Sequence, residues 1–458
     1  MTSISRAMAR FALDLSYDAI PAPALKEAKR FVLDSVGCAL AALDHEDMQQ
    51  AYQYIKSLGG HEQATIIGHG TKTNMANAAL MNALLIRAMD YNDIYWKQDP
   101  SHPSDILPAA FSPAEYRKLD GKELLVAILI AYEIEMRLCL AADPGVREVG
   151  WHHASLTQFT SPLVAGRVLG LNEDQIVAAT GISGSSHFTL GGVVAGHLTN
   201  MKNTADPMAT EAGVRAAMLA ATGYSGPVEL FEGKEGVFEV VSNVKWDPEK
   251  ILGGLGTEFL ITECGYKAFP TEALTHQPIT GVLDVMSQNG IDPHKVVEVK
   301  IETTTRGADI LSDPSKYEPK TKETADHSLP YCIAVAVTKG NVLPSDFTDE
   351  AIKDPFVWET LPKIKVVANA EIDGLFPAVK RAIVTITTED GNAYSIQTDH
   401  AKGRAESPLS DEELIDKFRA NAGHAMTPER MDKVVEATFA LENLTDVGDY
   451  MTLLTRDQ

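Results

Sequence analysis

The pattern of apolar and polar positions divides the chain into a long helical part and a shorter mixed part. Up to residue 265, apolar residues recur with the period of a helix that buries one face. The run 73–89 is rich in Ala, Leu and Met on nearly every face, which predicts a wholly buried helix. Further helices are expected at 21–42, 49–58, 106–119, 122–142, 155–169, 173–182 and 208–222.

After residue 265 the pattern mixes strands with helices. Asp390-Gly391 stands between the last two predicted strands and is typical of a tight hairpin turn. Ser410 and Thr427 then occupy the N-cap positions of two more helices. The expected strands are 296–305, 363–368, 382–388 and 393–398, and the expected helices are 275–288 and 328–339.

These patterns predict a mainly α fold with an α+β second domain. We expect an all-helical domain at 1–265, an α+β domain at 266–401, and a return of the chain to the helical domain at 402–458. A chain of 458 residues is too long for one hydrophobic core, which favours this division. The glycine-rich stretch 181–196 fits neither GxGxxG nor GxxxxGK[ST], so it predicts close packing of chain segments rather than a phosphate site.

One polar loop, residues 90–105, lies between two apolar helices and holds four Asp, one His and one Lys. Asp90 and Asp93 are three residues apart and would share a face if the preceding helix continued. The proline after His102 disfavours a helical backbone there, and Ser104 and Asp105 could cap the next helix. Function often sits on loops that a rigid scaffold holds, but the same residues would also suit a solvated surface loop.

Lys202 precedes an Ala-rich helix. A cation near a helix start opposes the helix dipole, so Lys202 is either solvated at the surface or paired with a bound anion. Other polar groups stand at 150–153, 266–276, 325–331 and 374–377. Each histidine in them, taken singly, is more typical of a capped or core residue than of a catalyst.

The charge of the chain excludes several partners. A net charge of −23 repels nucleic acid and anionic membranes, and no Lys/Arg tract offsets it. An anionic substrate would therefore need a local cationic pocket. The most apolar window, 124–142, contains Glu133, Glu135 and Arg137, so it predicts a core helix and no membrane span. The first 20 residues lack the pattern of a signal or transit peptide, and a cytoplasmic location is expected.

The cysteine spacing argues against a bound metal or cluster. Cys38, Cys139, Cys264 and Cys332 lie too far apart for a zinc knuckle, a redox pair or an iron–sulfur site. No HxxH or HExxH spacing is present either. We therefore expect four reduced thiols, no metal and no cofactor.

Taken together, the polar motifs resemble the MmgE/PrpD family over nearly the whole chain. That family includes 2-methylcitrate dehydratases, cis-aconitate decarboxylases and iminodisuccinate epimerases. The resemblance implies a helical domain, an α+β lid domain, an active site between them and a homodimer. The motifs that carry it are Ala88-Met-Asp-Tyr-Asn-Asp93, His102-Pro-Ser-Asp105, Gly150-Trp-His152, Met201-Lys202, Lys267-Ala-Phe-Pro270 and Ala325-Asp-His-Ser-Leu-Pro-Tyr331.

The resemblance also implies the site residues. The positions that correspond to catalytic ones are Asp90, His102, His152, Lys202 and Tyr331, and those expected to bind substrate are Lys267, His276, Asp93 and His327. The long 90–102 loop and His327-Ser-Leu-Pro-Tyr331 resemble the dehydratase branch. His152 is more typical of the decarboxylase and epimerase branches, and Ile94 stands where the family usually has Thr.

The expected activity is the cofactor-free dehydration of 2-methylcitrate or citrate by acid/base catalysis. Aconitase-type dehydration uses an iron–sulfur Lewis acid, which these cysteines cannot hold, so a side chain must act as the acid. Decarboxylation of a cis-aconitate-type substrate and epimerisation of a dicarboxylate remain alternatives. A carboxylate-binding protein without catalysis is an alternative of another class.

Overall fold

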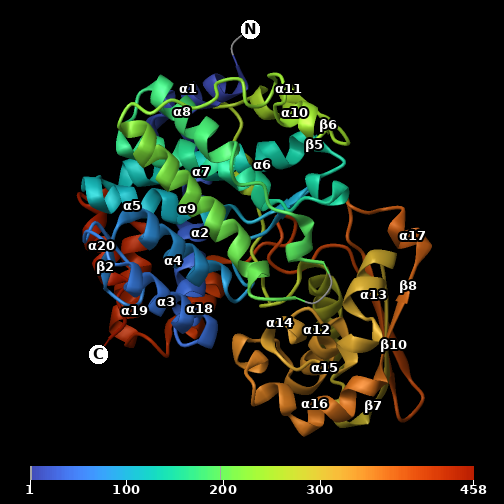
Figure 1. The fold of residues 1–458 in the computed structure, drawn as a ribbon. Coiled ribbons are helices and arrows are strands. Elements are labelled where there is room, and N and C mark those ends of the chain that lie inside the picture. The colour runs from blue at the N-terminus through green and yellow to red at the C-terminus, as the bar shows by residue number, and fades with distance from the viewer. Residues whose placement is uncertain (1–2, 196–197, 458) are drawn as a thin grey trace. The chain divides into compact units, whose positions relative to one another are not determined.

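The computed structural model describes residues 3–195 and 198–457, which form two compact units (Figure 1). The first unit comprises the chain up to Cys264 and again from Ser410, and the second unit spans Gly265–Leu409. The contacts thus divide the chain at 264/265 and 409/410, where the sequence suggested 265/266 and 401/402. Gly196, the last glycine of the stretch 181–196, lies outside the described residues.

The first unit is built from helices. Most expected helices are confirmed to within a few residues, and Asn172 caps its helix with a reciprocal capping box. The sequence missed α1 and α20, and it placed the start of α9 too late, since α9 begins at Met201 and runs through Pro207. The longer helices are α1 (Ile4–Asp14), α2 (Ala22–Ala41), α3 (Glu46–Leu58), α4 (Met75–Arg87), α5 (Leu107–Arg117), α6 (Gly121–Ala141), α7 (Ala154–Leu169), α8 (Glu173–Gly184), α9 (Met201–Ala221), α18 (Asp411–Ala422), α19 (Pro428–Phe439) and α20 (Val447–Leu453).

The second unit is an α+β structure around one four-stranded sheet of order β10-β9-β7-β8. Strand β9 alternates buried and half-buried residues, so one face of the sheet is covered. Helix α12 lies on β9 and β10, and Gly281 permits this because a Cβ there would stand 2.8 Å from Val384. The strands of the sheet and the two longest helices of the unit are β7 (Val296–Thr303), β8 (Ile364–Ala368), β9 (Ala382–Thr388), β10 (Ala393–Thr398), α12 (His276–Asn289) and α15 (Leu329–Lys339).

The strand pairing follows from the connections. Strands β9 and β10 form the expected antiparallel hairpin, with Gly391 at a φ of +81° in its turn. Strands β7 and β8 are parallel, and the helices between them provide the crossover that a parallel pair requires. Among the described residues, none of the helices combines the length and the apolar character that a bilayer crossing needs.

Helices α7 and α9 of the first unit approach each other closely. A Cβ on Gly213 would lie 2.7 Å from the backbone nitrogen of Pro162, so only glycine fits there. The hydroxyl of Ser161 donates to the carbonyl oxygen of Ala209 at 3.0 Å, which ties the two helices together. Side chains near the N-terminal ends of both helices can therefore meet.

The returning helix α18 is anchored by a buried lysine. The Nζ of Lys417 lies 2.7 Å from the carboxylate of Asp34 on α2 and donates to the carbonyl oxygen of Tyr91 at 2.8 Å. It also lies 3.8 Å from the centroid of the Tyr91 ring. Because Tyr91 is the second residue of the polar loop 90–105, the C-terminal segment supports the start of that loop directly.

We expect Lys417→Met to destabilise the protein by about 3–5 kcal/mol, because it would leave the buried carboxylate of Asp34 without its partner. The measurement is urea unfolding at neutral pH. Replacing both partners, as Asp34→Leu with Lys417→Met, should restore much of the loss. A single variant as stable as the wild type would contradict this role for Lys417.

Candidate functional site

The polar loop 90–105 is buried, so its interpretation as a solvated surface loop is wrong. Within this loop, all of which the structure describes, Lys97 alone is exposed and Gln98 is half-buried. The loop folds into a small hairpin of β3 (Tyr95–Trp96) and β4 (Pro100–Ser101), followed by a short 3-10 helix, Pro103–Ile106. Buried polar side chains cost free energy unless they are paired, so the pairing inside this loop is informative.

Asp90 departs from the helix that precedes it. Helix α4 ends at Arg87, and Asp90 has a left-handed backbone with a φ of +46°. The expectation that Asp90 and Asp93 share a helix face is therefore wrong, because the helix does not continue to them. The carboxylate of Asp90 contacts Arg87 and lies 2.8 Å from the Nζ of Lys202. A strained residue held by two cations is typical of a functional site.

Lys202 is buried, with 6% of its surface exposed, which excludes the surface alternative. It lies in the first turn of α9, and in this structure the anion beside it is Asp90. Lys202→Ala would therefore remove one of the cations that balance a buried carboxylate, and a loss of stability is expected from it.

Asp105 and Ser104 do not cap the next helix as expected. Asp105 lies 3.4 Å from the Nε of Arg87 and accepts a hydrogen bond from the side-chain amide of Asn92 at 2.9 Å. Burial raises the pKa of Asp105 well above its usual range, in spite of Arg87. Both side chains thus serve the loop rather than the helix, because their partners lie in the segment 87–93.

Asp93 holds the two ends of the loop together. Its carboxylate accepts the backbone N–H of Ser104 at 3.0 Å and the hydroxyl of Ser104 at 2.6 Å. Burial raises the pKa of Asp93 to about 6. The hydrogen bonds of Asp93 to Ser104 support the loop. Its role as a substrate ligand stays a prediction.

His102 is fixed in one tautomer. Its Nδ1 lies 2.6 Å from the carbonyl oxygen of Asp93, and a carbonyl oxygen only accepts, so Nδ1 carries the proton. In a neutral ring, the basic lone pair is then on Nε2. His102 is 5% exposed, which suits a base shielded from bulk water.

His152 has the opposite tautomer. Its Nδ1 accepts the backbone N–H of Ala154 at 3.2 Å, so a neutral ring carries its proton on Nε2. Burial lowers the pKa of His152 well below its usual value, and the neighbouring His153 lowers it further. His152 is therefore a neutral hydrogen-bond donor, whereas His102 presents a base.

A third histidine, His153, lies between these two and a buried carboxylate. Its ring centroid is 3.9 Å from that of His152 and 5.6 Å from that of His102. Its Nε2 lies 3.3 Å from a carboxylate oxygen of Asp206 on α9. Burial raises the pKa of Asp206, but His153, His152 and Arg87 outweigh burial and hold the pKa below its usual range.

His152, His153 and Asp206 each place one potential metal-ligand atom within 4.8 Å of the others. The hydrogen bonding of His152 argues against a metal, because a ring that accepts at Nδ1 has its proton on Nε2 and no second lone pair to offer. Arg87 adds positive charge beside Asp206. We interpret the three residues as a hydrogen-bonding group.

Glu135 on α6 is a further buried acid close to this group. It accepts hydrogen bonds from three hydroxyls, those of Ser101 at 2.6 Å, Thr160 at 2.7 Å and Thr157 at 3.1 Å. Burial raises the pKa of Glu135 to about 7. An acid that titrates near neutrality can exchange protons at physiological pH.

The second unit brings together two of its predicted residues. The Nζ of Lys267 donates to the carbonyl oxygen of Thr271 at 3.1 Å, and the Nε2 of His276 lies 3.3 Å from the same oxygen. Lys267 is 1% exposed, so its charge is deeply buried. A lysine and a histidine that converge in this way can offer positive charge to an anion.

The other two predicted residues of this unit have partners of their own. His327 contacts the carboxylate of Asp326, which also lies 3.5 Å from the Nζ of Lys322. The hydroxyl of Tyr331 donates to the carbonyl oxygen of Asp346 at 2.7 Å, and burial raises its pKa. A catalytic role for Tyr331 would require that hydroxyl to leave its carbonyl partner.

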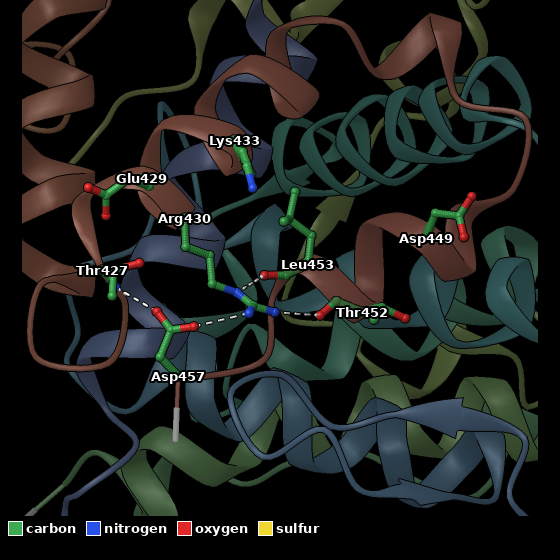
Figure 2. Close-up of a pocket in the computed structure, with 8 residues that line it drawn as sticks. All are labelled: Thr427, Glu429, Arg430, Lys433, Asp449, Thr452, Leu453 and Asp457. Atoms are coloured by element: carbon green, nitrogen blue, oxygen red, sulfur yellow. Dashed lines mark hydrogen bonds and ion pairs between the residues drawn. The ribbon is translucent and has the colours of Figure 1, made fainter.

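A surface pocket of about 340 Å³ lies at the C-terminal helices of the first unit. Figure 2 shows Arg430 inside it, where the guanidinium binds Asp457 and the carbonyl oxygens of Leu453 and Thr452. None of the predicted site residues is among those that line it. These bonds occupy Arg430, so the pocket is not the candidate site.

Sequence reasoning missed five members of the buried group: Arg87, Asp105, Glu135, His153 and Asp206. Two of them carried a usable signal, because Arg87 and Glu135 stand in otherwise apolar helices and must be paired if the helices are buried. His153 and Asp206 lie far apart in the sequence and meet only because α7 and α9 pack closely.

Comparison with known proteins gives consistent matches along the chain. The model of the MmgE/PrpD N-terminal domain matches residues 6–249, and that of the C-terminal domain matches residues 269–441. A cis-aconitate decarboxylase-like protein, oryM, of Aspergillus oryzae is 25% identical over 480 residues, covering 99% of this chain and 97% of the relative. A 2-methylcitrate dehydratase of Cupriavidus necator is 26% identical, covering 93% and 92%. The human cis-aconitate decarboxylase is 24% identical, covering 94% and 90%.

We expect Glu135→Gln to stabilise the protein at pH 8 and not near pH 4. The folded state holds the Glu135 proton more tightly than the unfolded state, because burial raises the pKa from 4.5 to about 7. The unfolding free energy therefore falls by about 3 kcal/mol at most as the pH rises from 4.5 to about 7. At higher pH it is level. Urea unfolding of both proteins at the two pH values measures this. An equal difference at both would contradict it.

We expect the purified protein to contain substoichiometric metal and to show no rise in Tm with zinc chloride, because His152 has no lone pair for a metal. Elemental analysis and thermal unfolding are the measurements. One metal ion per chain that disappears in His153→Ala would contradict this interpretation.

Proposed function

Because the chain belongs to the MmgE/PrpD family, we propose that it is a lyase that acts on a small di- or tricarboxylate. Within that class, we propose dehydration of 2-methylcitrate or citrate to the cis-aconitate-type product. The dehydratase and decarboxylase-like relatives are 26% and 25% identical, so similarity does not separate the two reactions. The geometry of the first unit is therefore what distinguishes dehydration from decarboxylation in this proposal.

The observation that carries the proposal is the pair of opposite tautomers. His102 donates through Nδ1 to Asp93 and has its lone pair on Nε2, whereas His152 accepts at Nδ1 and has its proton on Nε2. Dehydration needs a base for the C–H proton and a donor for the departing hydroxyl. Decarboxylation needs a proton donor to carbon and no base, so a base beside a donor favours dehydration.

The proposed step balances as follows. The Nε2 of His102 takes the proton from the carbon beside a carboxylate, and the electron pair of that C–H bond forms the C=C bond. The C–O bond breaks with its electron pair on oxygen, and the hydroxyl leaves as hydroxide, with His152 as its hydrogen-bond donor. Negative charge that develops on the carboxylate is stabilised by cations in a shielded site, the role we give to Lys202 and Arg87.

Asp90 is proposed to set the position of these cations. It contacts both Arg87 and Lys202, so it fixes their charges in place before the substrate binds. Preorganised charges need no rearrangement during the reaction, which lowers the barrier. In the second unit, Lys267, His276 and His327 remain proposed substrate-binding residues and Tyr331 a proposed donor.

Other features expected from the family remain proposals: a homodimer, and turnover without cofactor or metal. Decarboxylation of a cis-aconitate-type substrate is the second candidate, and it is favoured by the relatives of that name. Ile94, which stands where the family usually has Thr, is buried in the loop. The hydroxyl that it lacks is the reason to keep a non-catalytic carboxylate-binding protein as an alternative. A functional test therefore has to distinguish dehydration, decarboxylation and binding alone.

The test is an assay of the purified protein with 2-methylcitrate, citrate and cis-aconitate, which follows the ultraviolet absorbance of the enoate. Appearance of the enoate from a hydroxy acid is the expected result. Release of CO2 from cis-aconitate would instead establish a decarboxylase, and solvent deuterium uptake without net conversion would establish an epimerase. Binding without any of these changes would refute the lyase.

We expect His102→Ala to lower kcat by about 100- to 10,000-fold with little change in KM, because an acid/base group acts mainly in the transition state. Lys97→Ala is the matched control, since Lys97 lies in the same loop but is exposed and pairs with Glu263. Steady-state kinetics of both variants measure the effect. A normal kcat with a raised KM in His102→Ala would make His102 a binding residue.

A further inference from the structure

Two buried carboxylates behind the histidines share one threonine hydroxyl. The Oγ1 of Thr157 lies 3.1 Å from the Oε1 of Glu135 and 3.3 Å from the Oδ1 of Asp206. The other oxygen of Asp206 lies 3.3 Å from the Nε2 of His153. Glu135, Thr157, Asp206 and His153 are each at most 4% exposed, so a continuous polar path runs through a buried region.

The surroundings of the two carboxylates differ in charge. Asp206 faces His153, His152 and Arg87, which favour its ionised form. Glu135 faces the hydroxyls of Ser101, Thr157 and Thr160, and its charged neighbour is Asp206. The remaining titratable groups close by are Cys139 beside Glu135, Asp105 near Asp206 and Asp99 near His153. Two adjacent acids whose environments differ in this way take different protonation states.

We propose that Glu135, Thr157, Asp206 and His153 form a proton relay that exchanges protons with His102. The inference rests on the proposed function, since it concerns the acid/base chemistry of that same site. It adds to that function a route by which the proton removed from the substrate leaves the base. His153 reaches the site because its ring lies beside those of both His102 and His152.

Delivery of one proton to His102 proceeds in three linked transfers. In the first, a doubly protonated His153 gives its Nδ1 proton to His102 and becomes neutral. Asp206, now without a cationic partner on that side, takes the hydroxyl proton of Thr157, and Thr157 takes the proton of Glu135. The network thus changes from neutral to singly negative, and the charge ends on Glu135, where three hydroxyls donate to it. Uptake of a proton from His102 is the reverse sequence.

The structure offers a matched pair of threonines for the test. Thr157 and Thr160 lie on the same face of α7, both are buried, and both donate to Glu135. Of these two, Thr157 is the one that also contacts Asp206. Thr157→Val and Thr160→Val therefore remove the same group from the same helix, and only the first interrupts the path.

We expect Thr157→Val and Glu135→Gln each to lower kcat by about tenfold or more with little change in KM. The double variant should be no slower than the slower single variant, because both interrupt one path. Thr160→Val should retain kcat within about threefold, on the scale of a lost hydrogen bond outside the path. In the wild type, kcat should change with pH around pH 7, and kcat plotted against the D2O fraction should be curved. Both effects should be absent from Glu135→Gln.

Equal losses in Thr157→Val and Thr160→Val, or an unchanged pH profile in Glu135→Gln, would overturn the relay. If the wild type turns over none of the three tricarboxylates, the proposed function fails, and 15N NMR of His153 decides the relay separately. If Glu135 is linked to His153 through the path, the 15N shifts of His153 should report the ionisation of Glu135 and change near pH 7 in the wild type and in Thr160→Val, but not in Glu135→Gln. The same pH dependence of these shifts in all three proteins would refute the relay.

Discussion

The burial of Asp90 between Arg87 and Lys202 is the constraint on which the rest of the site depends. A carboxylate that is 2% exposed is tolerable only with paired cations, and these come from the end of α4 and the start of α9. Asp90 meets them with a left-handed backbone, shortly after the end of α4, where the chain turns into the buried loop. The loop then carries Asp93 to the position where its carbonyl oxygen fixes the tautomer of His102.

The site is thus set by charge balance as much as by shape. Lys417 holds the start of the loop from α18, and the close approach of α7 to α9 at Gly213 brings His153 to Asp206. The two acids have different environments. His153, His152 and Arg87 hold the pKa of Asp206 below its usual range, whereas burial raises the pKa of Glu135 to about 7. That contrast is what acid/base chemistry near neutrality requires.

The sequence predicts those parts of the fold that local patterns determine. Strands β9 and β10 and their turn follow from alternation and Asp390-Gly391, and the burial of α4 follows from its composition. Long-range pairing leaves no such local signal. Pro207 hid the true start of α9, and Lys202 therefore seemed to precede the helix instead of lying in its buried first turn. Glu135 was visible within an apolar helix, but its hydroxyl partners come from three other positions in the chain.

The central claim is that His102 and His152 have opposite tautomers, one a base and the other a donor. NMR of the protein with 15N-labelled histidine measures the tautomers directly at neutral pH. Variants in which one histidine is replaced at a time assign the signals. The account predicts a proton on Nδ1 of His102 and a proton on Nε2 of a neutral His152. The same tautomer in both rings, or a charged His152 at neutral pH, would contradict it.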